Sequence, residues 1–157
     1  MTHTRARLVV LALITGFAVL ATAQAQEKKI KREELPPAVE KTVAQQSQGA
    51  TIKGFSTEVD KGKRLYEVEL TVDGHAKDIS MDKDGKIVEV EEEVAMDSLT
   101  PEVKAGLTSA AGGGTILKVE SLTKGGKLVA YEAAVKNGPK HSEVQVGPEG
   151  KKLAHEE

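Results

Sequence analysis

Residues 66–72 of the chain, YEVELTV, alternate between apolar and polar side chains. A period of two places successive side chains on opposite faces of a β-strand. The alternation returns in residues 79–81 and 88–91, and the turn-forming pairs Asp73-Gly74 and Asp84-Gly85 separate the segments. The pattern predicts antiparallel strands with one face in a core and the other in water. The residues predicted to be buried are Tyr66, Val68, Leu70, Ile79, Met81, Val88 and Val90.

Ahead of each group of strands, apolar residues recur four positions apart. Val39 and Val43 form the first such pair, and Val103 and Leu107 form the second, later in the chain. Positions four apart share one face of a helix. Prolines at positions 36, 37 and 101 suit the first turn of a helix, and glycines at 49 and 112–114 suit its end. We therefore expect one short helix ahead of each group of strands.

Residues 35–94 and 99–157 share the order of several short motifs. The sequence LPP at position 35 matches LTP at position 99, and DGK at position 84 matches EGK at position 149. Similarity of this kind is typical of a duplicated unit. We therefore predict an α+β fold made of two tandem repeats, each with one helix packed on an antiparallel sheet of about four strands. The second repeat is degenerate, and residues 94–98 link the two.

The N-terminus has the features of a signal peptide. Two arginines precede an apolar run that ends in Ala23-Gln24-Ala25, and small residues two positions apart favour cleavage after Ala25. The alternative is a retained membrane anchor, but the run is shorter than the roughly 20 apolar residues that span a bilayer. The predicted divisions are a signal peptide at 1–25 and a charged leader at 26–34, followed by the two repeats. The mature protein is expected in the periplasm or secreted.

The amino-acid composition of the chain limits the classes of molecule that we expect it to bind. Removal of residues 1–25 takes away Arg5 and Arg7, so 20 of the 22 basic residues remain against 24 acidic ones, a formal charge of −4. A mildly acidic chain with few aromatic residues argues against nucleic acid or an anionic membrane as partner. The chain contains no cysteine, which excludes disulfides and a cysteine nucleophile. We expect a monomer whose partner is another protein.

Residues 80–91 resemble a calcium-binding loop. Such a loop needs acidic residues at positions 1, 3 and 5, glycine at 6 and glutamate at 12. Counting from Ser80, the residues Asp82, Asp84, Gly85 and Glu91 fill positions 3, 5, 6 and 12. Serine replaces the first carboxylate, and the flanking segments alternate as strands where the motif requires helices. We therefore interpret the segment as a hairpin turn and keep a calcium site at Asp82, Asp84 and Glu91 as the alternative.

Other candidate chemistries lack a recognisable pattern. His75, His141 and His155 lie far apart, without the spacing of zinc ligands. The glycine-rich segment 110–116 follows a predicted helix, so it does not have the form of a phosphate-binding loop. The acidic stripe Glu89, Glu91 and Glu93 is interpreted as the solvated face of a strand, with an acidic docking surface as the alternative. We predict no catalytic residue, no cofactor, no metal site and no enzymatic activity.

The order of helix, strands and turns resembles the PepSY and PepSY-like domain family. The motifs that carry the resemblance are an isoleucine in the first strand, a Tyr-Glu-Val strand, and a last hairpin with Asp, Gly, Lys and a branched residue. In this chain they are Ile52, Tyr66-Glu67-Val68, Met81-Asp82, and Gly85-Lys86-Ile87-Val88. Tandem copies of such a unit also resemble the secreted beta-lactamase inhibitor proteins. The resemblance implies an exported, non-enzymatic module that binds proteins or restrains peptidases.

Overall fold

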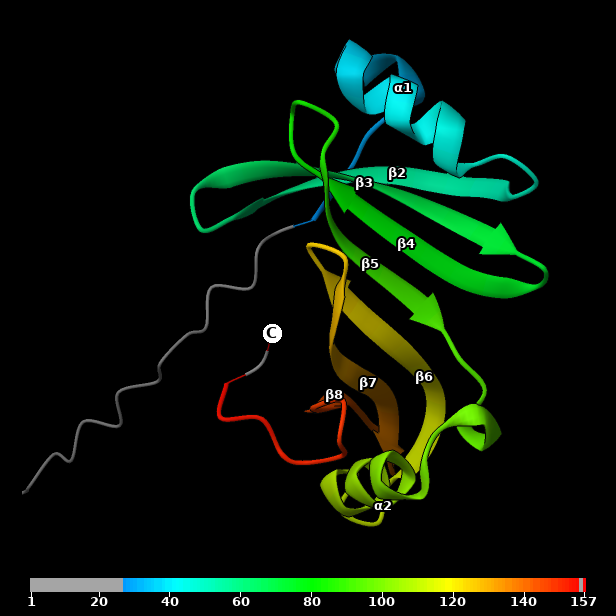
Figure 1. Cartoon of the computed structure of the whole chain (residues 1–157), viewed down its shortest axis with the longest axis vertical. Helices are drawn as coiled ribbons and strands as arrows, with labels where there is room; N and C mark the ends of the chain where they lie inside the picture. The colour runs from blue at the N-terminus through cyan, green and yellow to red at the C-terminus, as the bar shows by residue number, and fades with distance from the viewer. Residues whose placement is uncertain (1–26, 156) are drawn as a thin grey trace, which may run out of the picture.

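The computed structural model describes residues 27–155 and 157. Their fold is one eight-stranded antiparallel sheet, with its strands in chain order from β1 to β8, and two α-helices (Figure 1). Neither described helix has the length and apolar composition needed to span a membrane. The predicted signal peptide at 1–25 lies outside the described residues, whereas most of the charged leader lies within them.

The elements follow the two predicted groups of one helix and several strands. The first group contains β1 (Lys28–Lys29), α1 (Pro37–Gln46), β2 (Thr51–Asp60), β3 (Lys63–Val72), β4 (His75–Met81) and β5 (Ile87–Glu93). The second contains α2 (Pro101–Ala110), β6 (Thr115–Lys124), β7 (Lys127–Asn137) and β8 (Lys140–Val146). Short 3-10 helices, η1 (Arg32–Glu34) and η2 (Met96–Ser98), precede α1 and α2.

The predicted fold of two tandem units, each with its own sheet, is wrong. Strand β5 pairs with β6 from Glu89, opposite Lys124, to Glu93, opposite Glu120, so a single sheet runs through the molecule. The amide of Val94 then donates to the carbonyl of Val119 at 2.9 Å, which continues the contact into the predicted linker. The physical reason is that an unpaired strand edge exposes a row of amide and carbonyl groups, and pairing of β5 with β6 satisfies them.

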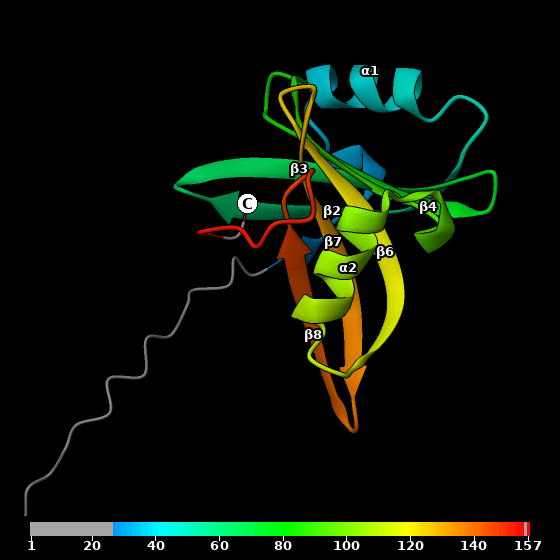
Figure 2. The same cartoon turned by 60° about the horizontal axis from the view of Figure 1, so that its bottom comes forward.

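Both helices cover the same face of this sheet. Val39 and Val43 of α1 pack on a core from β3 and β4, and Val103 and Leu107 of α2 pack on a second core from β6 to β8. Figure 2 shows α2 lying over β6 to β8, with α1 at the other end of the sheet. The strand residues that complete the two cores are Val68, Leu70, Ile79 and Met81 in the first and Val119, Ala133, Val135 and Val146 in the second.

The predicted strand register agrees with the observed burial. Val68, Leu70, Ile79 and Met81 are buried as expected, whereas Tyr66, Val88 and Val90 are only half-buried. A slip of one residue would have moved the apolar side chains to the opposite face. Glu67 and Glu69 therefore project from the side of the sheet that carries no helix.

Candidate functional site

The side of the sheet opposite the helices carries most of the ionisable groups, and we call it the open face. Residues paired on neighbouring strands place their side chains next to one another on this face, in rows that run across the strands. The acidic members of the open face include Glu58, Glu67, Glu69, Asp78, Glu89, Glu91, Glu93, Glu120, Glu132 and Glu143. Its basic members include Lys29, Lys118, Lys124 and Lys136. Carboxyl groups thus outnumber ammonium groups on this face.

The centre of the open face is a row that crosses both halves of the sheet. Asp78 of β4 lies between Glu69 of β3 and Glu91 of β5, and Glu91 in turn lies opposite Leu122 of β6. Leu122 is only 2% exposed and belongs to neither hydrophobic core. The row therefore places carboxyl groups beside a buried apolar side chain, which removes much of the water that would solvate their charge.

Burial and mutual repulsion raise the pKa values of several of these carboxyl groups. Burial, followed by the nearby carboxylate of Glu132, raises the pKa of Glu91 to about 8. Burial and then Asp78 raise the pKa of Glu67 to about 7, and burial and then Glu120 raise the pKa of Asp78 to about 6. At neutral pH the open face therefore holds protons that isolated carboxyl groups would have lost.

Some open-face carboxylates already have partners. Lys118 pairs with Glu120 at 2.8 Å, and Lys124 pairs with Glu89 at 3.1 Å. The amide of Gln145 donates to Glu132 at 2.7 Å. Within residues 27–155 and 157, no side-chain hydrogen bond or ion pair involves Glu91. The same holds for Asp78, but the pKa of Glu91 is raised further, so Glu91 is the clearer candidate to receive a positive or hydrogen-bonding neighbour.

Two groups of three carboxyl residues form on this face. Oxygen atoms of Asp78, Glu91 and Glu120 lie within 4.8 Å of one another, and Glu27, Glu67 and Glu69 form a second group by the same measure. Chemically, such groups attract cations, whether the ammonium or guanidinium groups of a protein or a metal ion.

The residues of the predicted calcium alternative are separated by the fold. Asp82 lies in the turn between β4 and β5, where its carboxylate accepts the amides of Asp84 at 2.9 Å and Lys86 at 3.0 Å. Asp84 is exposed and pairs with Lys83 at 2.8 Å. In the described part of the chain, neither aspartate belongs to a group of three clustered carboxylates, whereas Glu91 joins Asp78 and Glu120. The segment thus forms a hairpin turn stabilised by the side chain of Asp82.

The other candidate residues lie apart from the open-face centre. His75 begins β4, and His141 lies in β8, and both are exposed. The glycines at 112–114 end α2, as predicted. The acidic stripe Glu89, Glu91 and Glu93 is half-buried, so it is less solvated than predicted. Asp78, Glu120 and Glu132 are not recognisable as a group in the sequence, because their proximity depends on strand pairing.

Comparison with known proteins identifies the fold. Neither a protein-family model nor a curated protein matches the sequence. Among solved structures, a DUF2874 family protein from Bacteroides ovatus is 20% identical with a TM-score of 0.58, and the match covers 76% of this chain and 84% of that one. A BLIP-like protein from Bacteroides fragilis is 21% identical with a TM-score of 0.55, covering 76% and 83%. A predicted periplasmic protein from Bacteroides eggerthii is 15% identical with a TM-score of 0.61, covering 76% and 86%.

These similarities concern the fold alone. They agree with the predicted resemblance to beta-lactamase inhibitor proteins at the level of chain arrangement. The resemblance to PepSY domains stays a prediction, since no family model matches.

Proposed function

We propose that the chain is an exported, non-enzymatic protein-binding module whose open face binds a positively charged surface of another envelope protein. The observation that carries the proposal is the row of half-buried carboxyl groups around Glu91, which crosses both halves of the sheet and lies outside the cover of the helices. Export is supported by the predicted signal peptide, and by the periplasmic description of a protein with a similar fold. The BLIP-like description of another supports binding to a protein.

The charge of the open face defines the partner's chemistry. Each carboxylate repels the next, and burial withholds the water that would weaken this repulsion. A lysine or arginine side chain placed among Asp78, Glu91 and Glu132 relieves the repulsion and supplies hydrogen bonds. Arginine suits such a site best because its planar guanidinium binds carboxylates in pairs. The finer form of the proposal is that the partner is a peptidase, which the module restrains.

Replacing three carboxyl groups of the open face by amides is expected to weaken partner binding strongly. The test protein is the chain from Gln26 onward with Asp78→Asn, Glu91→Gln and Glu132→Gln, so that none of the three side chains can ionise and their shape is kept. The matched control replaces the same number of carboxyl groups at exposed positions away from the open face, Glu33→Gln, Glu102→Gln and Glu149→Gln. We expect recovery of the partner from an envelope extract to fall about tenfold or more for the open-face variant, equivalent to about 1.4 kcal/mol or more.

Two results would contradict the proposal. One is equal recovery of the partner by the open-face and control variants, which would place the binding site elsewhere. The other is catalytic turnover by the purified chain on a broad substrate panel. If the recovered partner is a peptidase, the wild-type chain should slow its hydrolysis of substrate and the open-face variant should not.

Calcium binding through Asp82, Asp84 and Glu91 is the alternative that the sequence offers, although the fold brings Glu91 to Asp78 and Glu120 and not to the two turn aspartates. Calorimetric titration with calcium separates it from protein binding, because a site in the β4–β5 turn requires the carboxylate of Asp84. A heat signal that disappears in Asp84→Ala would support this alternative. A signal retained in that variant would exclude the turn as the site.

A further inference from the structure

The outer edge of β8 is an unpaired strand edge beside a groove. Beyond β8, the described residues contribute one backbone bridge, between Val146 and Lys152, and a hydrogen bond from the amide of Glu157 to the side chain of Gln145 at 2.9 Å. In the first half of the molecule the strand equivalent to β8 is β4, and its outer edge is paired with β5 from Met81 to Lys77. The amide and carbonyl groups of an unpaired edge are a template for another strand.

The groove lies between β8, α2 and residues 150–155. Its volume is about 640 Å³. Gly106, Ser109 and Ala110 line it from α2, and Val144 and Val146 line it from β8. Small residues on the helix leave room for side chains of an added strand, and the two valines offer that strand an apolar contact.

The first half of the molecule shows what fills the equivalent space. There Ile87 and Val90 of β5 pack against the core beneath α1. The backbone pairing of Met81 with Ile87 corresponds to the pairing of Val146 with Lys152, since both residue numbers increase by 65. The same offset aligns Val90 with His155.

Polar side chains explain why residues 152–155 do not fill the groove themselves. Lys152 and His155 are both exposed. Moving them into the positions of Ile87 and Val90 would desolvate an ammonium group and an imidazole without a partner, which is costly. Leu153 and Ala154 of this segment also line the groove, and Leu153 is half-buried. Lys152 and His155, however, leave the positions equivalent to Ile87 and Val90 without an apolar side chain, so the groove can accept apolar side chains there.

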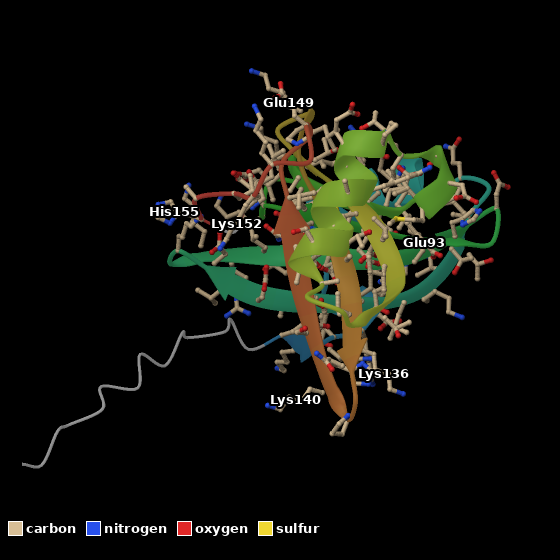
Figure 3. The ribbon with its side chains drawn as sticks, turned by 90° about the horizontal axis from the view of Figure 1, so that it is seen from below. Glu93, Lys136, Lys140, Glu149, Lys152 and His155 are labelled. Atoms are coloured by element: carbon tan, nitrogen blue, oxygen red, sulfur yellow. The ribbon has the colours of Figure 1, made fainter. Side chains whose placement is uncertain are left out.

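The charges around the edge define the complementary strand. Lys140 and His141 lie at the hairpin end of β8. Lys152 and His155 border the groove, and among its described lining residues Glu143 carries the one carboxylate. Figure 3 shows Lys152 and His155 together beside β8, with Lys140 at the hairpin tip. A strand with acidic side chains next to its apolar ones complements Lys140 and Lys152. The sequence of β5, IVEVEEE, has this composition.

We propose that the outer edge of β8 and its groove bind an extended segment of a partner protein, in which apolar residues alternate with acidic residues, as a ninth strand of the sheet. Main-chain hydrogen bonds to β8 would supply affinity, and the apolar side chains in the groove would supply specificity, as in other cases of strand addition. The groove meets the open face at Gln145, whose amide donates to Glu132. Its apolar lining from α2, Val144 and Val146 lies on the helix-covered side, so either binding activity can fail without the other.

The test uses a synthetic peptide with the sequence of residues 86–94, KIVEVEEEV, and the isotope-labelled chain from Gln26 onward. We expect saturable NMR shift changes and slowed amide exchange at Ser142 to Gln145. Ala110→Glu places a bulky negative charge in the groove from an exposed helix position, and should weaken binding about tenfold or more. The matched control, Ala105→Glu, changes an exposed residue of the same helix that does not line the groove, and should bind as the wild type does.

Several outcomes would overturn the proposal. One is the absence of saturable peptide binding to the wild-type chain, and another is equal binding by the Ala110→Glu and Ala105→Glu variants. A third is NMR shift changes centred on β4 and β6, because these would mean that the peptide displaces β5. A peptide of the same composition, with its apolar residues gathered at one end, should bind at least tenfold more weakly. Equal binding of that peptide would show simple charge attraction in place of strand addition. Circular dichroism of both variants verifies that α2 remains folded.

Discussion

Gly150→Ala is expected to destabilise the protein by about 2–5 kcal/mol. Gly150 has a φ of +75°, a conformation that an L-residue with a side chain adopts only under strain. A Cβ atom at this position would also overlap the backbone carbonyl of Glu102 in α2. Backbone atoms cannot rotate away as a flexible side chain would, so the turn after β8 would have to separate from the helix. Gly106 contributes to the same close approach, because a Cβ there would overlap the carbonyl of Gly150.

The same contact occurs in the first half, and the chain offers a matched control. Gly85 also has a φ of +75°, and a Cβ there would overlap the carbonyl of Ala38 in α1. The hydroxyl of Thr42 donates to the carbonyl of Gly85 at 2.8 Å, which fixes the turn on the helix. Gly138, with a φ of +59°, has no atom within 4 Å of an added Cβ, so Gly138→Ala tests backbone strain alone.

Urea unfolding of the three alanine variants measures the difference. We expect Gly150→Ala and Gly85→Ala to lose more stability than Gly138→Ala, whose cost should be about 1 kcal/mol. Equal losses in all three would mean that the close approach to the helices contributes nothing and that only the backbone conformation matters.

The alternation of polar and apolar residues was sufficient to predict β3, β4 and β5 and their faces. It was also sufficient, with the proline and glycine positions, to predict helices where α1 and α2 occur. It could not predict which strand edges meet, because the side-chain period describes the two faces of a strand and carries no information about its edges. For this reason the pairing of Glu89 with Lys124, which joins the two halves into one sheet, was missed.

The candidate site was predictable only in part for the same reason. The stripe containing Glu91 is visible in the sequence, but its neighbours Asp78 and Glu120 lie on two other strands. Their approach depends on the register of β4 and β6 against β5. Likewise, the sequence predicts a turn at Gly85 and places Gly150 at the matching position of the second repeat, whereas their contacts with α1 and α2 require the tertiary structure.

Glu91→Gln is expected to stabilise the protein at alkaline pH by a few kcal/mol. The pKa of Glu91 is raised from 4.5 to about 8, so the folded state binds this proton more tightly than the unfolded state does. The resulting stability is fully present below about pH 4.5 and is lost as the pH rises through about 8. Glu67 and Asp78, whose pKa values are raised to about 7 and about 6, act in the same direction over lower parts of this range. Stability should therefore decline from pH 5 to pH 9.

Glutamine at position 91 retains the shape of the protonated side chain and cannot ionise. The variant should match the wild type at pH 5, exceed it at pH 9, and show a shallower decline between the two, as measured by urea unfolding at each pH. Each unit of pKa difference corresponds to about 1.4 kcal/mol, and the remaining contact of Glu91 with solvent reduces the total below the full product. Glu102→Gln, at an exposed position of α2, removes the same charge as a control and should leave the pH dependence unchanged. Two results would contradict this prediction. One is a wild-type stability that rises between pH 5 and pH 9, and the other is a Glu91→Gln profile that runs parallel to that of the wild type. Either would show that Glu91 ionises without cost and that the open face is better solvated than its burial indicates.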